Sequence, residues 1–322
     1  MMLIYALQTA LSLAVIFWLV SLPLRSRAGF WMLGLAAVLL TLLEALQGVR
    51  GFLPWWVPYL MAMMLVGAVA FRLIRAPARA GLPFGPFGWL SLAILVGIAG
   101  LSGAQSSESL RARQMPSGPF IELAWPLGPG IFLVADGVAA SINAHSAVLD
   151  SVQPLDAGFG GSGYGLDLIA ENRWGIRAPT VMPAEPARHA IFGTPVLATS
   201  AGQVLLAVDG RPDLPVSEKD EGHPAAGNHV LLRCGGFDIR LGHFRQGSLR
   251  VAVGDRLIVR QQIGDTGNPS ESAEPHPHIH ARTPGTPENP FSGTPVPIRL
   301  EGRFLARNDL VETGALPGPT NP

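Results

Sequence analysis

The segment Pro275–Thr283, which reads PHPHIHART, carries residues suited to metal chemistry. His278 and His280 are separated by one apolar residue, so on a β-strand both imidazoles project from the same face. Two imidazoles on one side of a rigid strand suit a divalent metal, with zinc as the first candidate. A histidine-rich surface loop or a hydrogen-bonded structural pair is the alternative, and the rest of the chain bears on the choice.

The composition limits the classes of partner and site. The chain has 322 residues, of which 48% are hydrophobic and 14% charged. Its 23 Lys and Arg residues balance 23 Asp and Glu residues, so no net basic field attracts nucleic acid, and no such partner is expected. The single cysteine, Cys234, excludes an internal disulfide framework and a cysteine-based zinc site.

Apolar residues are concentrated before about residue 105, in four segments typical of membrane spans. About 20 mostly apolar residues cross the hydrocarbon of a bilayer. Three segments meet this length: Leu3–Pro23, Phe30–Val49 and Phe84–Ala104. The fourth, Trp55–Ala70, is marginal. Residues 1–105 are therefore predicted to form a transmembrane region of four helices in contact with membrane lipid.

Arginines set the expected orientation of these helices. Arg25 and Arg27 lie between the first and second segments, and Arg72, Arg75 and Arg79 lie between the third and fourth. The positive-inside rule places both loops in the cytoplasm. The N-terminus and everything after residue 105 are then expected outside.

The second part of the chain is typical of an all-β domain. After a linker or lead-in at residues 106–139, short runs rich in Val, Ile and Leu alternate with Gly, Pro, Asn and Asp. This pattern predicts a two-sheet sandwich or barrel. The domain is expected to span residues 140–310, with a flexible tail at residues 311–322.

The order of these runs resembles the lysostaphin-type zinc endopeptidases, also called LytM-like domains. The resemblance spans roughly Ala140–Arg307 and rests on GTPVLATSAGQVL, GNHVLL, LGHF, VGDRLIVRQQIGDTGN and HIH, in that order. The flanking INAH, YGLDL and GRFLARND resemble a divergent bacterial subgroup. The resemblance implies one zinc ion per chain and hydrolysis of peptide bonds in peptidoglycan cross-links or stem peptides. It also implies a multi-pass protein of the bacterial inner membrane, with the β domain on the periplasmic side.

The same resemblance assigns roles to four residues. Asp167 in YGLDL matches the aspartate ligand of zinc, and His280 matches the last histidine ligand. His278 and the His243 of LGHF match two histidines that act on the attacking water and the oxyanion. A zinc site with three protein ligands lowers the pKa of a bound water to about 7. Neutral imidazoles nearby can relay protons to the leaving amine.

One position departs from the family. Gly163 stands four residues before Asp167, where the family carries its first histidine ligand. In one interpretation His145 of INAH replaces that ligand. In the other, the site has lost a ligand, and the domain is a catalytically inactive module that binds cell wall or activates a partner hydrolase. The presence of the other four residues together favours an intact site.

The remaining histidines are interpreted as structural or exposed. His276, which lies between two prolines, is predicted to be an exposed loop residue or a contact at the rim of the site. His189, His223 and His229 lie in connections or at a strand start, and none has metal-like spacing.

Overall fold

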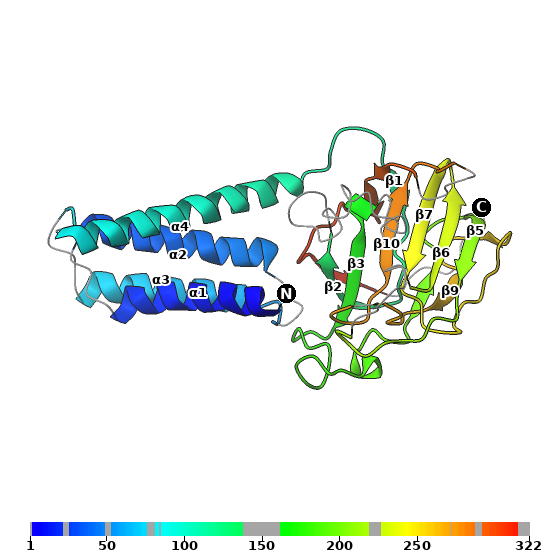
Figure 1. Ribbon diagram of the computed structural model, residues 1–322, viewed down its shortest axis with the longest axis horizontal. Coiled ribbons are helices and arrows are strands. Elements are labelled where there is room, and N and C mark those ends of the chain that lie inside the picture. The colour runs from blue at the N-terminus through cyan, green and yellow to red at the C-terminus, as the bar shows by residue number, and fades with distance from the viewer. Residues whose placement is uncertain are drawn as a thin grey trace. The chain divides into compact units, whose positions relative to one another are not determined.

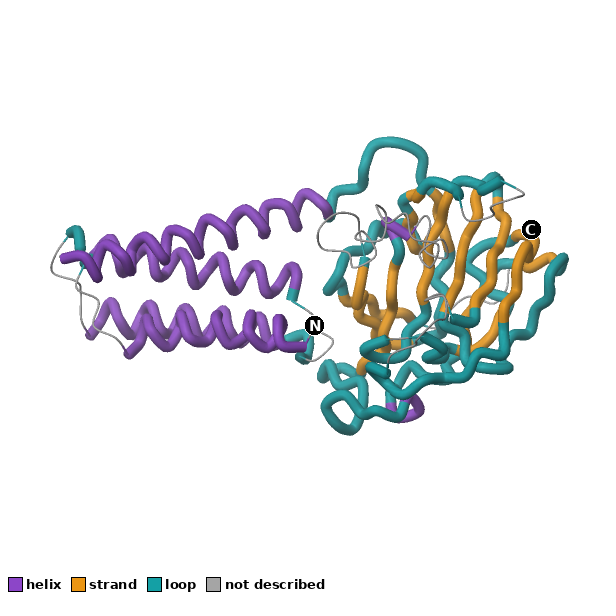
Figure 2. Tube along the Cα trace, in the orientation of Figure 1, coloured by secondary structure: helices purple, strands orange, loops and turns teal. Residues whose placement is uncertain are grey.

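The computed structural model describes residues 2–21, 26–48, 53–75, 81–83, 85–137, 162–218, 227–270, 272–286 and 292–314. The chain divides into two compact units, Met1–Arg111 and Ala112–Pro322. The first unit is helical and the second is mostly β-sheet (Figures 1 and 2).

The helical unit contains four helices: α1 (Met2–Ser21), α2 (Arg27–Gln47), α3 (Val57–Arg75) and α4 (Gly85–Ala112). Three of them, α2, α3 and α4, are long and apolar enough to cross a membrane. In α1, the stretch Thr9–Ser21 is apolar but too short to count as a span. Apolar helices therefore occur at all four predicted positions, and three satisfy the length and composition of a span.

A buried carboxylate joins the first two helices. Glu44 of α2 is 6% exposed and accepts hydrogen bonds from the hydroxyl groups of Thr9 and Ser12 in α1. A carboxylate in apolar surroundings needs such donors, because an unpaired charge there is costly. The three side chains therefore act as a polar contact between α1 and α2.

Helix α4 continues past its apolar part to Ala112, so residues 106–112 of the predicted linker or lead-in are helical. No Gly or Pro interrupts residues 104–112, so no helix breaker stops the helix before Ala112. Arg113 follows directly and donates to the Asp309 carboxylate over 2.7 Å and to the Arg307 carbonyl over 2.6 Å. The β unit thus begins immediately after the helix.

The main sheet has nine strands in the order β13-β2-β3-β10-β7-β6-β5-β8, with β11 also paired to β10. Their bounds are β2 (Gly130–Asp136), β3 (Leu166–Glu171), β5 (Gly202–Val208), β6 (His229–Cys234), β7 (Phe237–Gly242), β8 (Arg256–Leu257), β10 (His278–Arg282), β11 (Pro295–Val296) and β13 (Leu310–Thr313). Two small sheets pair β1 (Ile121–Leu123) with β12 (Ile298–Leu300) and β4 (Pro195–Leu197) with β9 (Gln262–Asp265). Strands β1 and β2 lie in the predicted lead-in, so the sheet architecture starts before residue 140.

Alternation along the strands separates an apolar face from a polar one. Ile279 and Ala281 of β10 belong to the hydrophobic core, as do Leu166 and Leu168 of β3. The residues between them project to the other face, because side chains alternate along a strand. That second face of β3, β10 and β7 carries the predicted site.

Candidate functional site

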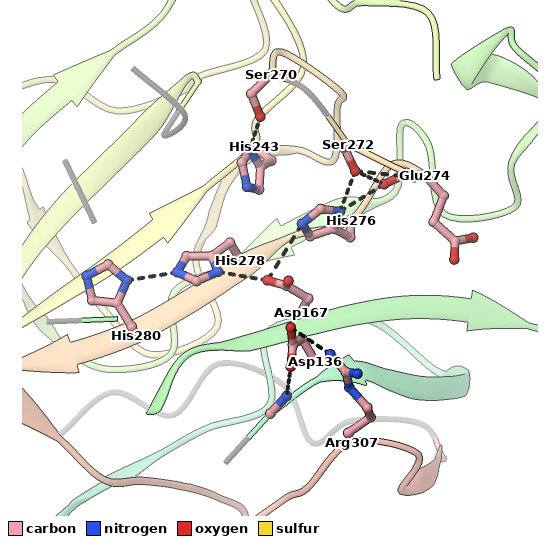
Figure 3. Close-up of polar contacts among 11 residues, drawn as sticks. Asp136, Asp167, His243, Ser270, Ser272, Glu274, His276, His278, His280 and Arg307 are labelled. Carbon is pink, nitrogen blue, oxygen red and sulfur yellow. Dashed lines mark hydrogen bonds and ion pairs between the residues drawn. The ribbon is translucent and has the colours of Figure 1, made fainter. Parts of the chain in front are cut away.

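The register of three neighbouring strands brings predicted site residues together. In the antiparallel sheet His278 lies opposite Asp167 on β3 and opposite Gly242 on β7. His280 follows on the same face of β10, and His243 comes directly after β7. Figure 3 shows these side chains converging.

The imidazole of His278 links Asp167 to His280. Its Nδ1 lies 2.7 Å from Asp167 Oδ1, and its Nε2 lies 2.8 Å from His280 Nδ1. All three residues are buried. An ionised carboxylate only accepts hydrogen bonds, so His278 Nδ1 donates, and the Nε2 of the neutral ring accepts from His280. The carboxylate therefore fixes both the orientation and the tautomer of His278.

Two further imidazoles lie beside this row (Figure 3). His243 Nδ1 is 3.1 Å from the hydroxyl of Ser270, and the His243 ring centre is 6.0 Å from that of His278. His276 packs edge-on against His243, with 4.7 Å between ring centres, and its Nε2 lies 3.6 Å from Asp167 Oδ1. The structure thus gathers four histidines and one aspartate in one cluster.

His276 is less exposed than the predicted loop residue, and it contacts the site, which agrees with the alternative prediction of a rim contact. Its side chain is only 14% exposed and faces the carboxylate of Asp167. The sequence did contain a signal for this: His276, His278 and His280 recur at every second position, so an extended backbone places all three on one side. The flanking prolines, Pro275 and Pro277, instead favour a loop at this position.

His243 adopts a strained backbone conformation. Its φ of 63° lies in the left-handed region, which costs a non-glycine residue on the order of 1–3 kcal/mol. The turn is held by the amide of Gly267, which donates to the His243 carbonyl over 2.7 Å. Strain of this kind persists where the surrounding structure fixes it, and it directs the His243 ring toward the cluster.

The predicted replacement ligand, His145, lies outside the described residues. Gly163 lies in a short 3-10 helix, η3 (Ser162–Tyr164), immediately before β3. The prediction that His145 takes the place of a histidine at Gly163 stays a prediction.

The zinc that the resemblance implies can be tested against this geometry. Imidazole nitrogens and carboxylate oxygens suit zinc. Because each ligand atom lies about 2.0–2.1 Å from the ion, any two ligand atoms lie within about 4 Å of each other. Asp167 Oδ1 and His280 Nδ1 contact opposite nitrogens of the His278 ring, which places them roughly 7 Å apart. In this arrangement the pair does not fit one zinc ion. Among the described residues, no three His, Cys, Asp or Glu side chains are placed to hold a metal.

Two buried arginines lie next to His280 on the polar face of the sheet. Arg240 lies opposite His280 on β7, and Arg282 ends β10 opposite Asp238. Burial lowers the pKa of Arg240 to about 9, with a further lowering from Arg282, and burial lowers the pKa of Arg282 to about 10. Burial also lowers the pKa of His229 to about 3, so this imidazole is neutral at pH 7. The two guanidinium groups create a positive field at this end of the cluster.

No protein-family model and no curated protein matches the chain. Among solved structures it is similar to the catalytic domain of the prophage-encoded M23 protein EnpA from Enterococcus faecalis, with 18% identity over 54% of this chain and 88% of that one and a TM-score of 0.26. It is also similar to the antimicrobial peptidase lysostaphin from Staphylococcus simulans, with 19% identity over 52% of this chain and 45% of that one and a TM-score of 0.26. For Csd3 from Helicobacter pylori the identity is 14% over 61% of this chain and 38% of that one, with a TM-score of 0.31. The neighbours include lysostaphin, whose family the motifs resemble, but at these identities and TM-scores the similarity decides nothing further about the site.

Proposed function

We propose that the β unit is a metal-dependent peptidase domain that hydrolyses peptide bonds in peptidoglycan. The observation that supports this is the cluster of one carboxylate and four imidazoles, of which all but His276 are buried. Folding assembles it from β3, β10, the end of β7 and the segment before β10. Burying polar groups costs free energy unless they are hydrogen-bonded. A scaffold without chemical work gains nothing from collecting so many at one place.

The chain's own residues supply the proton transfers of such a reaction. Asp167 keeps the proton of His278 on Nδ1, so Nε2 is the basic atom of that ring, and it can take up a proton once the hydrogen bond that it accepts from His280 is released. A neutral imidazole oriented by a carboxylate accepts and returns protons near pH 7. His243, held at Nδ1 by Ser270, is the second imidazole suited to proton transfer or to stabilising an oxyanion.

The apolar helices and the resemblance support the setting of this activity. We propose that residues 1–105 anchor the chain in the bacterial inner membrane and that the β domain faces the periplasm, where peptidoglycan peptides are available. The arginines between the helical segments support this orientation. Zinc enters the proposal through the resemblance alone, with His145, Asp167 and His280 as the predicted ligands and His243 and His278 as the predicted catalytic residues. Binding one zinc ion would require Asp167 and His280 to come closer together than they lie on either side of His278.

One observation favours a second function. Within the part of the chain that the structure describes, no three suitable side chains are placed to hold a metal. A β domain that holds no metal would bind wall polymer or a partner hydrolase without cleaving peptide bonds.

Peptidoglycan digestion separates the two functions. The full chain in detergent is incubated with isolated peptidoglycan, and mass spectrometry identifies the soluble fragments. We expect new peptide ends with the wild-type chain and a rate at least about 100-fold lower with Asp167→Asn, because the carboxylate orients the base. Asp255→Asn, at an exposed turn, is the matched control and should leave the rate unchanged. Wild-type chain that sediments with peptidoglycan and releases no peptide ends would reject the peptidase and support the binding module.

A further inference from the structure

The loop that follows β3 exposes large apolar side chains. In residues 172–181, which we call the Trp174 loop, Trp174 is 59% exposed, Ile176 51% and Val181 81%. A single exposed apolar residue needs no explanation, whereas several close together mark a surface that contacts a protein, a ligand or a membrane. Three such side chains within one short loop therefore indicate a contact surface.

Hydrogen bonds hold the tip of the Trp174 loop in one shape. The side-chain oxygen of Asn172 accepts from the amides of Trp174 and Ile176 over 2.9 and 3.0 Å. Gly175 adopts a φ of 74°, which favours glycine, and its amide donates to the Asn172 carbonyl over 2.8 Å. The tip is thus ordered before a partner arrives, which lowers the entropy cost of binding.

The loop and its continuation are positively charged. Residues 172–188 contain three arginines against one glutamate, although the whole chain has no net charge. The guanidinium of Arg173 lies over the Trp174 ring, 5.3 Å from its centre. An indole suits the interface of a bilayer because its ring is apolar and its N–H is polar, and arginine is attracted to anionic headgroups. The chemistry of this tip is therefore that of a lipid-binding loop.

The connection to the apolar helices keeps the β unit within reach of a bilayer. Helix α4 ends at Ala112 and β1 begins at Ile121. The eight residues between them span at most about 29 Å when fully extended. Arg113, the first of these residues, is itself held by the Asp309 carboxylate. The β unit therefore stays close to any membrane that α4 crosses.

From these observations we propose that the Trp174 loop binds the surface of the lipid bilayer that holds the apolar helices. Trp174 lies among the headgroups, and Arg173 pairs with lipid phosphate. Ile176 and Val181 contact the outer ends of the acyl chains. The inference rests on the membrane anchoring in the proposed function and is independent of peptide-bond cleavage.

The polysaccharide of the cell wall fits this loop less well than lipid does. Aliphatic side chains such as Ile176 and Val181 offer no hydrogen bonds to the hydroxyl groups of a sugar. The side-chain oxygen of Asn172 is already engaged within the loop. The exposed aliphatic groups therefore favour hydrocarbon as the partner.

Binding of the loop to lipid has a consequence for the candidate site. The loop follows β3, which carries Asp167, and its Arg177 forms an ion pair with Glu274, two residues before His276. A loop held at the bilayer surface therefore keeps the histidine cluster at a constant height above the membrane.

A spin label reports whether the loop contacts lipid. The full chain with Val181→Cys in a Cys234→Ser background is labelled with a nitroxide and reconstituted into vesicles of phosphatidylcholine and phosphatidylglycerol. Collisions of the label with oxygen, which partitions into lipid, are compared with its collisions with a nickel chelate, which stays in water. The matched control is Val253→Cys, because Val253 is 64% exposed and precedes β8, which lies five strands and about 24 Å from β3. We expect an oxygen-to-nickel collision ratio at least about threefold higher at position 181 than at position 253, since hydrocarbon excludes the chelate.

A second substitution tests the indole. Trp174→Asp in the chain labelled at position 181 should lower the collision ratio to the value at position 253, because a carboxylate is repelled by anionic headgroups and is costly to place in lipid. Trp174→Phe is the control and should keep most of the ratio. A ratio that is the same in Trp174→Asp and in the parent chain would contradict the proposed role of Trp174.

The possible failures are distinguishable. Extraction of the vesicles with alkaline carbonate shows whether the chain is inserted. If the chain stays in the vesicles and the two labels give equal ratios, binding of lipid by the loop is overturned while the membrane anchoring stands. If the label at position 181 is immobilised only when peptidoglycan fragments are added, the loop binds wall polymer and the proposal is likewise overturned. If carbonate removes the chain, the anchoring fails, and the inference fails with it.

Discussion

The hydrogen bond between Asp167 and His278 is the contact whose energy can be worked out most directly. It is 2.7 Å long, both groups are buried, and one partner is a carboxylate. Hydrogen bonds to charged groups contribute about 1.5–3 kcal/mol to stability, and neutral ones contribute about 1 kcal/mol. His278→Ala removes this bond and the 2.8 Å bond to His280, so it should lower the free energy of unfolding by about 3 kcal/mol or more.

A double-mutant cycle isolates the pair. We expect His278→Ala and Asp167→Ala to be less destabilising together than the sum of their separate effects, with a coupling energy of about 2 kcal/mol. In the assay, the full chain in detergent is unfolded with urea, and unfolding is monitored by hydrogen exchange in the peptides that cover β3 and β10. A coupling energy below about 0.5 kcal/mol would mean that the bond does not form, because independent sites add within that margin. The tautomer assigned to His278 would then lose its basis.

Two other predictions concern the sheet that carries the site. Burial lowers the pKa of His229 from 6.5 to about 3, so between these pH values the unfolded chain binds a proton that the folded chain does not. The contribution of His229 to stability is therefore complete above pH 6.5 and falls by about 1.4 kcal/mol per pH unit below it. When urea midpoints are measured at several pH values, the midpoint should fall less steeply with decreasing pH in His229→Gln than in the wild-type chain. Equal slopes of midpoint against pH in the two proteins would contradict the reasoning. Gly202→Ala should lower the thermal midpoint by several degrees, because its Cβ would lie 2.3 Å from the Arg233 carbonyl oxygen. Gly128→Ala is the control and should leave the midpoint unchanged, because its Cβ would meet nothing within 4 Å. Equal midpoints for these two variants would show that the close approach at Gly202 is absent.

The sequence predicts the strand β10 because alternation is a local property. Ile279 enters the core, and His278 and His280 share the other face, as the HIH spacing indicates. The all-β character of the second unit follows in the same way from runs of Val, Ile and Leu between turn residues. The choice of Asp167 as a neighbour came from the resemblance, since nothing local pairs residues 111 positions apart.

Other features of the site depend on contacts that no local pattern encodes. The loop before β10 is fixed by the ion pair of Glu274 with Arg177, 97 residues away, and this contact turns His276 inward. Arg240 and Arg282 lie at polar positions of their strands, which predicts exposure, yet they are 3% and 0% exposed. Their burial is a property of the tertiary structure, which strand alternation alone does not predict.

The end of α4 illustrates a different difficulty. Polar composition after residue 104 suggested a linker, but composition alone does not stop a helix. Ser, Glu, Leu, Arg and Ala continue a helix at little cost when no Gly or Pro intervenes. The first proline after the helix is Pro116, and the helix ends at Ala112.

The most direct test of the proposed peptidase is the dependence of peptide-bond cleavage on metal. The full chain in detergent is given isolated peptidoglycan, and newly formed amino groups are counted before chelation, after chelation and after zinc is restored. The proposed function predicts release of amino groups that stops with the chelator and returns with zinc. No release under any condition, or release that continues at the same rate after chelation, would contradict it.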